Sequence, residues 1–116
     1  MRIEPGETHT RQLGESLWLL TLRGEHDLST VPDLEAAFAR VEASGTTAVI
    51  DLTGVTFVDS SVIGLLIREQ KRGENLLVVA PSGCRVRRLL DLVALPSVLP
   101  IFETRDDAFR AVPAER

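Results

Sequence analysis

The chain of 116 residues carries a formal net charge of −4, and 44% of its residues are hydrophobic while 26% are charged. This length and composition suit one soluble globular domain with its own core and argue against intrinsic disorder. An acidic chain whose one basic cluster is Arg85, Arg87 and Arg88 is a poor candidate for nucleic-acid binding. That cluster could hold an anion, but a solvated helix face is the simpler interpretation.

No apolar run approaches the roughly 20 residues that cross a bilayer. The N-terminus has no apolar stretch typical of a signal peptide, so we expect a cytoplasmic protein without direct membrane contact.

The first elements along the chain are predicted to be two strands and a helix. An extended segment at 7–12 turns at 13–16 into an apolar run at 17–22, which favours an antiparallel pair. The polar segment 24–29 is predicted to be a loop. Thr30 and Asp33 have the spacing of a helix start, and apolar residues then recur at helical spacing up to a stop at Gly45.

The rest of the chain alternates apolar strand patterns with amphipathic helix patterns. Strands are expected at 48–58, 76–80 and 100–102, and helices after 61, around 86–93 and after a cap at Thr104. The order β-β-α-β-α-β-α-β-α predicts one α/β domain over residues 1–116, with a mixed, mostly parallel sheet flanked by about four helices. Residues 113–116 are expected to fray. The predicted core includes Ile50, Leu66, Val78, Leu89 and Phe109.

An enzyme would need a convergent set of reactive side chains, and the sequence offers few. It contains no Gly-rich phosphate loop and no Gly-x-Ser-x-Gly elbow. His9 and His26 fall in polar or edge positions, and a triad of Ser60, His26 and Asp27 is a combination that chance readily supplies. Cys84 is the only cysteine, and a half-buried first-turn residue is favoured over a reactive thiol. We expect no catalysis, metal or cofactor.

The polar triplet Asp59-Ser60-Ser61 is the candidate site, because it follows a strand and opens a helix. Backbone N–H groups lack partners at such a helix end, and the helix dipole favours negative charge there. A phosphate on one of these serines would therefore be stabilised. Spacing alone favours the simpler interpretation, an N-cap, because Asp and Ser are preferred capping residues.

The run of residues 51–61, Asp-Leu-Thr-Gly-Val-Thr-Phe-Val-Asp-Ser-Ser, is similar to the signature of STAS domains, which include the bacterial anti-sigma-factor antagonists. Further matches are Gly-Glu-His-Asp at 24–27, Val-Arg-Arg-Leu-Leu-Asp at 86–91, and Ile-Phe at 101–102 before an acidic last helix. The resemblance covers nearly the whole chain in the right order. It implies a STAS fold.

The resemblance also implies partner switching in transcription regulation. The unphosphorylated antagonist binds an anti-sigma factor that is also a serine kinase and carries its own ATP. This kinase phosphorylates the serine after the Asp, here Ser60, and the released phosphoprotein is restored by a serine phosphatase. We expect partner contacts at two loops that leave strand ends on one edge of the sheet. One loop carries Asp27 and Ser29, and the other carries Asp59, Ser60 and Ser61.

Two features depart from the family pattern. Val62-Ile63-Gly64 replaces the usual Gly-Leu-Gly, and the segment from Ser60 to the strand at Leu76 is about one helical turn shorter than usual. Val62 would add a β-branched side chain where a partner backbone approaches. Two other functions stay open. One is an accessory subunit that binds the ATPase of a lipid-transport complex, where STAS folds also occur. The other is a small hydrolase that uses Ser60.

Overall fold

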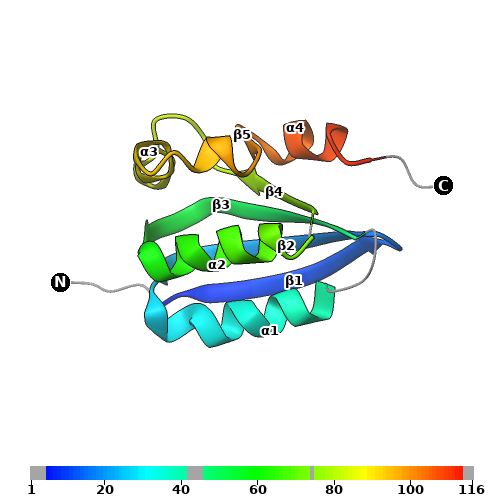
Figure 1. Cartoon of the computed structure of the whole chain (residues 1–116), viewed down its shortest axis with the longest axis horizontal. Coiled ribbons are helices and arrows are strands. Elements are labelled where there is room, and N and C mark those ends of the chain that lie inside the picture. Colours follow the sequence, from blue (N-terminus) through cyan, green and yellow to red (C-terminus); the bar gives the residue numbers. More distant parts are fainter. Residues whose placement is uncertain (1–4, 42–45, 74, 114–116) are drawn as a thin grey trace.

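A five-stranded sheet organises the molecule, with the strands in the order β1-β2-β3-β4-β5 (Figure 1). The computed structural model describes residues 5–41, 46–73 and 75–113. β1 and β2 are antiparallel, and each later strand pairs in parallel with the one before it. The predicted mixed, mostly parallel sheet is therefore confirmed. The strands are β1 (Glu7–Gly14), β2 (Leu17–His26), β3 (Thr47–Val58), β4 (Asn75–Val79) and β5 (Ile101–Phe102).

The connections between the strands are helical, in the predicted order. α1, α2 and α3 pack on one face of the sheet, and α4 packs on the other. In the part of the chain described, no helix is long and apolar enough to cross a membrane. The helices are η1 (Leu28–Thr30), α1 (Val31–Val41), α2 (Ser60–Lys71), α3 (Arg85–Leu92), η2 (Leu95–Ser97) and α4 (Arg105–Arg110), where η marks a 3-10 helix.

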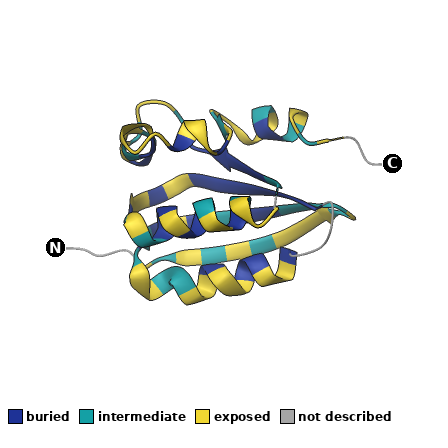
Figure 2. Ribbon diagram, viewed as in Figure 1, coloured by how far each residue is buried: buried dark blue, intermediate teal, exposed yellow. Residues whose placement is uncertain are grey.

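Two apolar clusters, one on each face of the sheet, form the core. Side chains alternate along a strand, so β2, β3 and β4 send one set toward α1–α3 and the other toward α4. Ile50 and Val78 belong to the first cluster, whereas Val49 and Leu77 pack with Ala108 of α4 in the second. Figure 2 shows β4 and the first half of β3 buried almost throughout. This double burial explains their nearly continuous apolar sequences.

The predicted core is confirmed for Ile50, Leu66 and Val78, which are all buried. The prediction of burial was wrong for Leu89 and Phe109, which are only half-buried. On α3 the face that meets the sheet is centred on Val86 and Leu90, and on α4 it is centred on Ala108. The predicted helix stop at Gly45 and most of the segment expected to fray lie outside the described residues.

Candidate functional site

Asp59 caps the N-terminus of α2. Its Oδ1 accepts hydrogen bonds from the N–H groups of Ser61 at 3.0 Å and Val62 at 3.3 Å. The predicted N-cap is thus confirmed. A hydrogen bond from the Ser61 hydroxyl is the largest cause that holds the pKa of Asp59 below its ordinary value. The N–H groups of Val62, Ser61 and Leu28 act in the same direction, so Asp59 carries its negative charge at neutral pH.

The two serines of the triplet differ in their availability. Ser61 is half-buried, and its hydroxyl donates to Asp59 Oδ1 at 2.5 Å. Ser60 is the first residue of α2 and is exposed, and its hydroxyl forms no hydrogen bond with any other described residue. Ser60 is therefore the more accessible of the two serines.

A second Asp-capped turn lies at the end of β2. Asp27 Oδ1 accepts from the N–H of Ser29 at 2.9 Å and from its hydroxyl at 2.5 Å, and so caps η1. Thr30 does not cap α1, because its hydroxyl donates to the backbone oxygen of Asp27. The sequence prediction of a cap at Thr30 was wrong because a turn of 3-10 helix precedes α1. Leu28, between Asp27 and Ser29, is 70% exposed.

The two turns are bonded to each other. The N–H of Asp59 donates to the backbone oxygen of His26 at 3.2 Å, and the N–H of Leu28 lies close enough to the Asp59 carboxylate to help lower its pKa. The starts of α1 and α2 accordingly lie at the same end of the molecule (Figure 1). The structure thus brings the five predicted contact residues to one edge, while their role in binding a partner stays a prediction. These residues are Asp27, Ser29, Asp59, Ser60 and Ser61.

His26 supports the Asp27 turn from the interior of the molecule. The sequence analysis wrongly predicted that this residue lies in a polar loop. β2 continues through His26, whose side chain is fully buried. Its Nε2 lies 3.1 Å from the backbone oxygen of Glu7 and 3.0 Å from that of Arg23, and its Nδ1 lies 3.0 Å from Thr30 Oγ1. Because these groups engage both ring nitrogens, His26 is not positioned as a base for Ser60.

Gly6 completes the packing around this histidine. A Cβ atom at Gly6 would lie 2.3 Å from the backbone oxygen of Glu25 and 3.1 Å from the His26 ring. Only a glycine allows the start of β1 to approach this closely. The N-terminal strand and the Asp27 turn are therefore packed into one unit.

Asp51, the first residue of the signature run, has a structural place away from the two turns. Its carboxylate accepts from the Thr53 hydroxyl and from Arg105 Nε at the start of α4. Burial by itself would raise the pKa of Asp51, but the hydrogen bonds from Thr53 and Arg105 outweigh it and hold the pKa below its ordinary value. The ion pair ties α4 to β3.

The structure also bears on three other residues that the sequence analysis singled out. Val62 is 1% exposed and points into the core, so its side chain does not meet an approaching partner. Cys84 is half-buried and caps α3, with its sulfur accepting from the N–H of Arg87. The Arg87 side chain bonds to Asp91 and Glu103, so this member of the basic cluster is not simply solvated. Within 5–41, 46–73 and 75–113 there is no group of side chains that could hold a metal ion.

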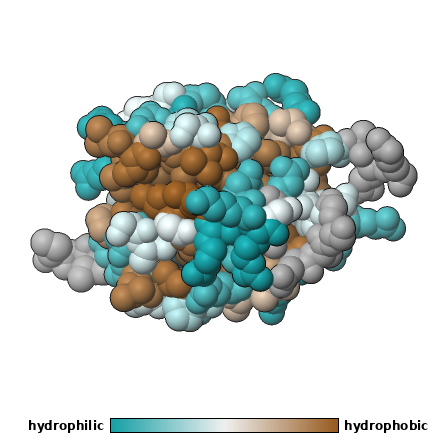
Figure 3. Space-filling view, in the orientation of Figure 1, coloured by the Kyte–Doolittle hydropathy of each residue, from teal (hydrophilic) through white to brown (hydrophobic). Residues whose placement is uncertain are grey.

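An apolar area extends beside the candidate site. Figure 3 shows brown side chains over α3 and the segment that follows it, at the end of the molecule where α2 begins. Leu92 is 78% exposed there, and Val93 and Val98 are 49% and 41% exposed. Exposed apolar side chains that gather in one area, beside polar groups, are typical of protein-binding surfaces.

Comparison with known proteins assigns the family. The model of the STAS domain matches residues 10–108. The chain belongs to the STAS domain family. An anti-sigma-F factor antagonist, RsfB, of Mycobacterium tuberculosis is 35% identical over 97 residues, which cover 81% of this chain and 80% of the relative. An anti-sigma-B factor antagonist of Staphylococcus epidermidis is 32% identical over 85 residues, covering 69% of this chain and 78% of the relative.

A solved structure agrees with this assignment. The crystal structure of an anti-sigma factor antagonist from Mycobacterium paratuberculosis superimposes with a TM-score of 0.80 at 29% identity. The match covers 93% of this STAS chain and 94% of the other. The sheet order and the helix placement described above are therefore those of the family.

Proposed function

We propose that this chain is an anti-sigma-factor antagonist, a regulatory binding protein and not an enzyme. Unphosphorylated, it binds an anti-sigma factor that is also a serine kinase, and phosphorylation of Ser60 releases it. A serine phosphatase then restores the binding form. Two similar proteins are named as anti-sigma factor antagonists, and this supports a function of the same class for this chain. The observation that carries the switch is the exposed Ser60 hydroxyl beside the Asp59 carboxylate.

The binding surface combines the two turns with the apolar side chains beside them. Exposed Leu28 lies next to Asp59, and its backbone N–H helps to lower the pKa of that carboxylate. Protein interfaces usually combine an apolar core with a polar rim, and this surface offers side chains of both kinds. This chain needs no cofactor, because the ATP is bound by the kinase. All of these steps take place in the cytoplasm.

Phosphorylation would act through charge. A phosphoserine carries about −1.5 to −2 charges at pH 7. The N–H groups of Ser61, Val62 and Ile63 already bond to Asp59, so a phosphate at Ser60 finds fewer free donors than the sequence suggested. Its charge therefore falls beside a carboxylate on the surface.

In an interface such like-charge contacts cost several kcal/mol. A hundredfold loss of affinity corresponds to about 2.8 kcal/mol. One phosphate at Ser60 is therefore sufficient for release.

The test is a phosphorylation assay with the anti-sigma factor that co-purifies with the chain from its native extract. Wild type and Ser61→Ala are expected to become phosphorylated at residue 60, as mapped by mass spectrometry, and to lose roughly a hundredfold in affinity. Ser60→Ala should resist phosphorylation and stay bound. Ser60→Asp should weaken binding only in part, because a carboxylate carries less charge than a phosphate.

Two results would contradict the proposal. One is phosphate on Ser61 alone, and the other is no phosphate on either serine with a kinase that modifies another substrate. Co-purification of a transporter ATPase in place of an anti-sigma factor would instead indicate the accessory-subunit function.

A further inference from the structure

β1 is the edge strand of the sheet, and its side chains divide between two faces. The register pairs Glu7, His9 and Arg11 with Arg23, Thr21 and Leu19 of β2, on the side of the sheet where α4 lies. α4 packs against β3, β4 and β5, so the side chains of Glu7, His9 and Arg11 stay exposed. An edge strand of this length is a template for pairing with another strand.

The charges on this face are self-complementary about His9. If two copies of β1 pair antiparallel with His9 opposite His9, Glu7 of each copy lies opposite Arg11 of the other. Directly opposite side chains of unlike charge stabilise such a pair. Other registers do not form both Glu–Arg pairs. If the pair is centred on Arg11, two arginines lie opposite each other, and if it is centred on Thr8, Glu7 lies opposite His9.

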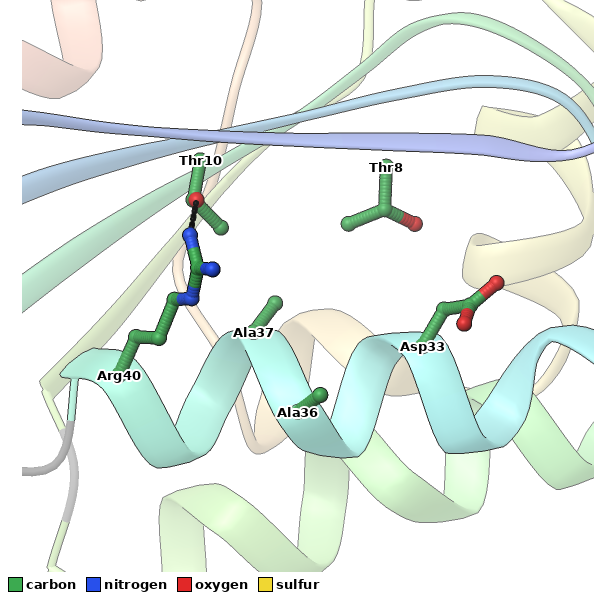
Figure 4. Close-up of a pocket in the computed structure, with 6 residues that line it drawn as sticks. All are labelled: Thr8, Thr10, Asp33, Ala36, Ala37 and Arg40. Carbon is green, nitrogen blue, oxygen red and sulfur yellow. Dashed lines mark hydrogen bonds between the residues drawn. The ribbon is translucent and has the colours of Figure 1, made fainter.

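The other face of β1 has the same symmetry. Thr8 and Thr10 point toward α1 and line a groove with Asp33, Ala36 and Arg40 (Figure 4). Arg40 lies at the Thr10 end, where its Nη1 donates to Thr10 Oγ1 at 3.3 Å, and Asp33 lies at the Thr8 end. In the His9 register Thr8 of one copy is opposite Thr10 of the other, so Asp33 of each copy faces Arg40 of the other.

Two sets of charges on opposite faces thus share one two-fold axis. The side chains that would form these pairs are exposed in the single chain. The small residue Ala36 lies between Asp33 and Arg40, where the two α1 helices would approach each other. We propose that β1 pairs with β1 of a second copy about an axis through His9, so that a homodimer forms with one sheet running through both subunits. The axis reverses the strand direction, so the Ser60 ends of the subunits point away from each other. The dimer is independent of the proposed switch.

Analytical ultracentrifugation of the full chain over a range of concentrations tests the dimer. Arg11→Glu and Glu7→Arg should each raise the dimer dissociation constant at least about tenfold, because the symmetry changes two pairs at once. The double variant E7R/R11E should restore wild-type association. The same pattern is expected for Asp33→Arg, Arg40→Asp and their combination.

Arg88→Glu is the matched control, because it makes the same change of charge at an exposed residue of α3 and should leave association unchanged. Circular dichroism confirms that each variant is folded. A chain that stays monomeric at every concentration at low salt would overturn the proposal. So would a dimer that each single change weakens but the double change does not restore.

Discussion

The turns at 27–29 and 59–61 are built with the same hydrogen bonds but present different side chains. In each, an Asp carboxylate accepts from the N–H and the hydroxyl of the Ser two residues later. The residue between them is exposed in both, Leu28 in the first turn and Ser60 in the second. The shared bonds fix the backbone, and the middle residue decides the chemistry. A leucine can only contact a partner, whereas a serine can also receive a phosphate.

The turns also differ in what depends on them. Asp59 caps a helix of 12 residues and its N–H donates to the backbone oxygen of His26 beside the first turn, while Asp27 caps a 3-10 helix of 3 residues. The second turn therefore supports the first. Four measurements test how the two turns differ.

The largest expected effect is on stability at Asp59. Asp59→Ala removes the cap of a long helix, a change that costs about 0.5 to 2 kcal/mol, and it also removes the negative charge that lies near the Leu28 N–H. Urea denaturation should show a loss of about 2 kcal/mol in the free energy of unfolding, at the upper end of this range. A loss no larger than that of Asp27→Ala would mean that the second turn does not support the first.

The next effect is on affinity at Leu28, and it rests on the proposed function. Leu28→Ala should weaken binding to the anti-sigma factor by about tenfold, because truncating a buried apolar contact in an interface costs about 1 to 2 kcal/mol. Leu13→Ala is the control, since Leu13 is exposed but lies at the other end of the strands. Isothermal titration calorimetry measures both. Equal affinities of the two variants for the anti-sigma factor would show that Leu28 does not contact it.

Asp27→Ala should cost about 1 kcal/mol in the free energy of unfolding, since its cap serves a short, exposed turn. Because that turn also positions Leu28 and Ser29, partner affinity should fall by more than twofold. If the affinity stays within twofold of wild type, Asp27 does not belong to the binding site. Asp27→Asn, which keeps a capping oxygen, separates the cap from the charge.

The smallest effect concerns pH. The folded protein holds the pKa of Asp59 below its ordinary value, so the ionised carboxylate adds stability above the unfolded-state pKa of about 3.9. That contribution is lost as the pH falls through the folded-state pKa. The stability difference between wild type and Asp59→Asn should thus be constant near neutral pH and shrink once the pH falls below about 3.9 and through the lower folded-state pKa. A difference that grows on acidification would show that another group is responsible.

The sequence predicted the order of elements because apolar periodicity is a local property. It also predicted that the two turns meet, because parallel strands end on one edge. His26 was misplaced since its neighbours Glu25 and Asp27 are polar, although the alternation from Leu20 and Leu22 points toward the core. That alternation was the signal that could have found it.

Other features depend on contacts between distant residues, which no local pattern encodes. Arg105 reaches Asp51 across 54 positions of the chain. Leu95 at the start of η2 and Leu99 just after it are fully buried, although no periodicity marks them. Leu89 is half-exposed because the face of α3 that meets the sheet is centred on Val86 and Leu90, and the sequence of α3 alone does not distinguish this face from one that includes Leu89.

The order of the strands in the sheet has a consequence for folding. Each strand pairs with the next one along the chain: Leu17 is beside Thr47, Thr47 beside Asn75, and Val78 beside Ile101. Every closure therefore spans a moderate length of chain, and the entropy of closing it stays small compared with that of a sheet whose first and last strands must meet. On the ribosome, each new strand would find its neighbour already synthesised, and β4 would wait only for β5 to cover its edge.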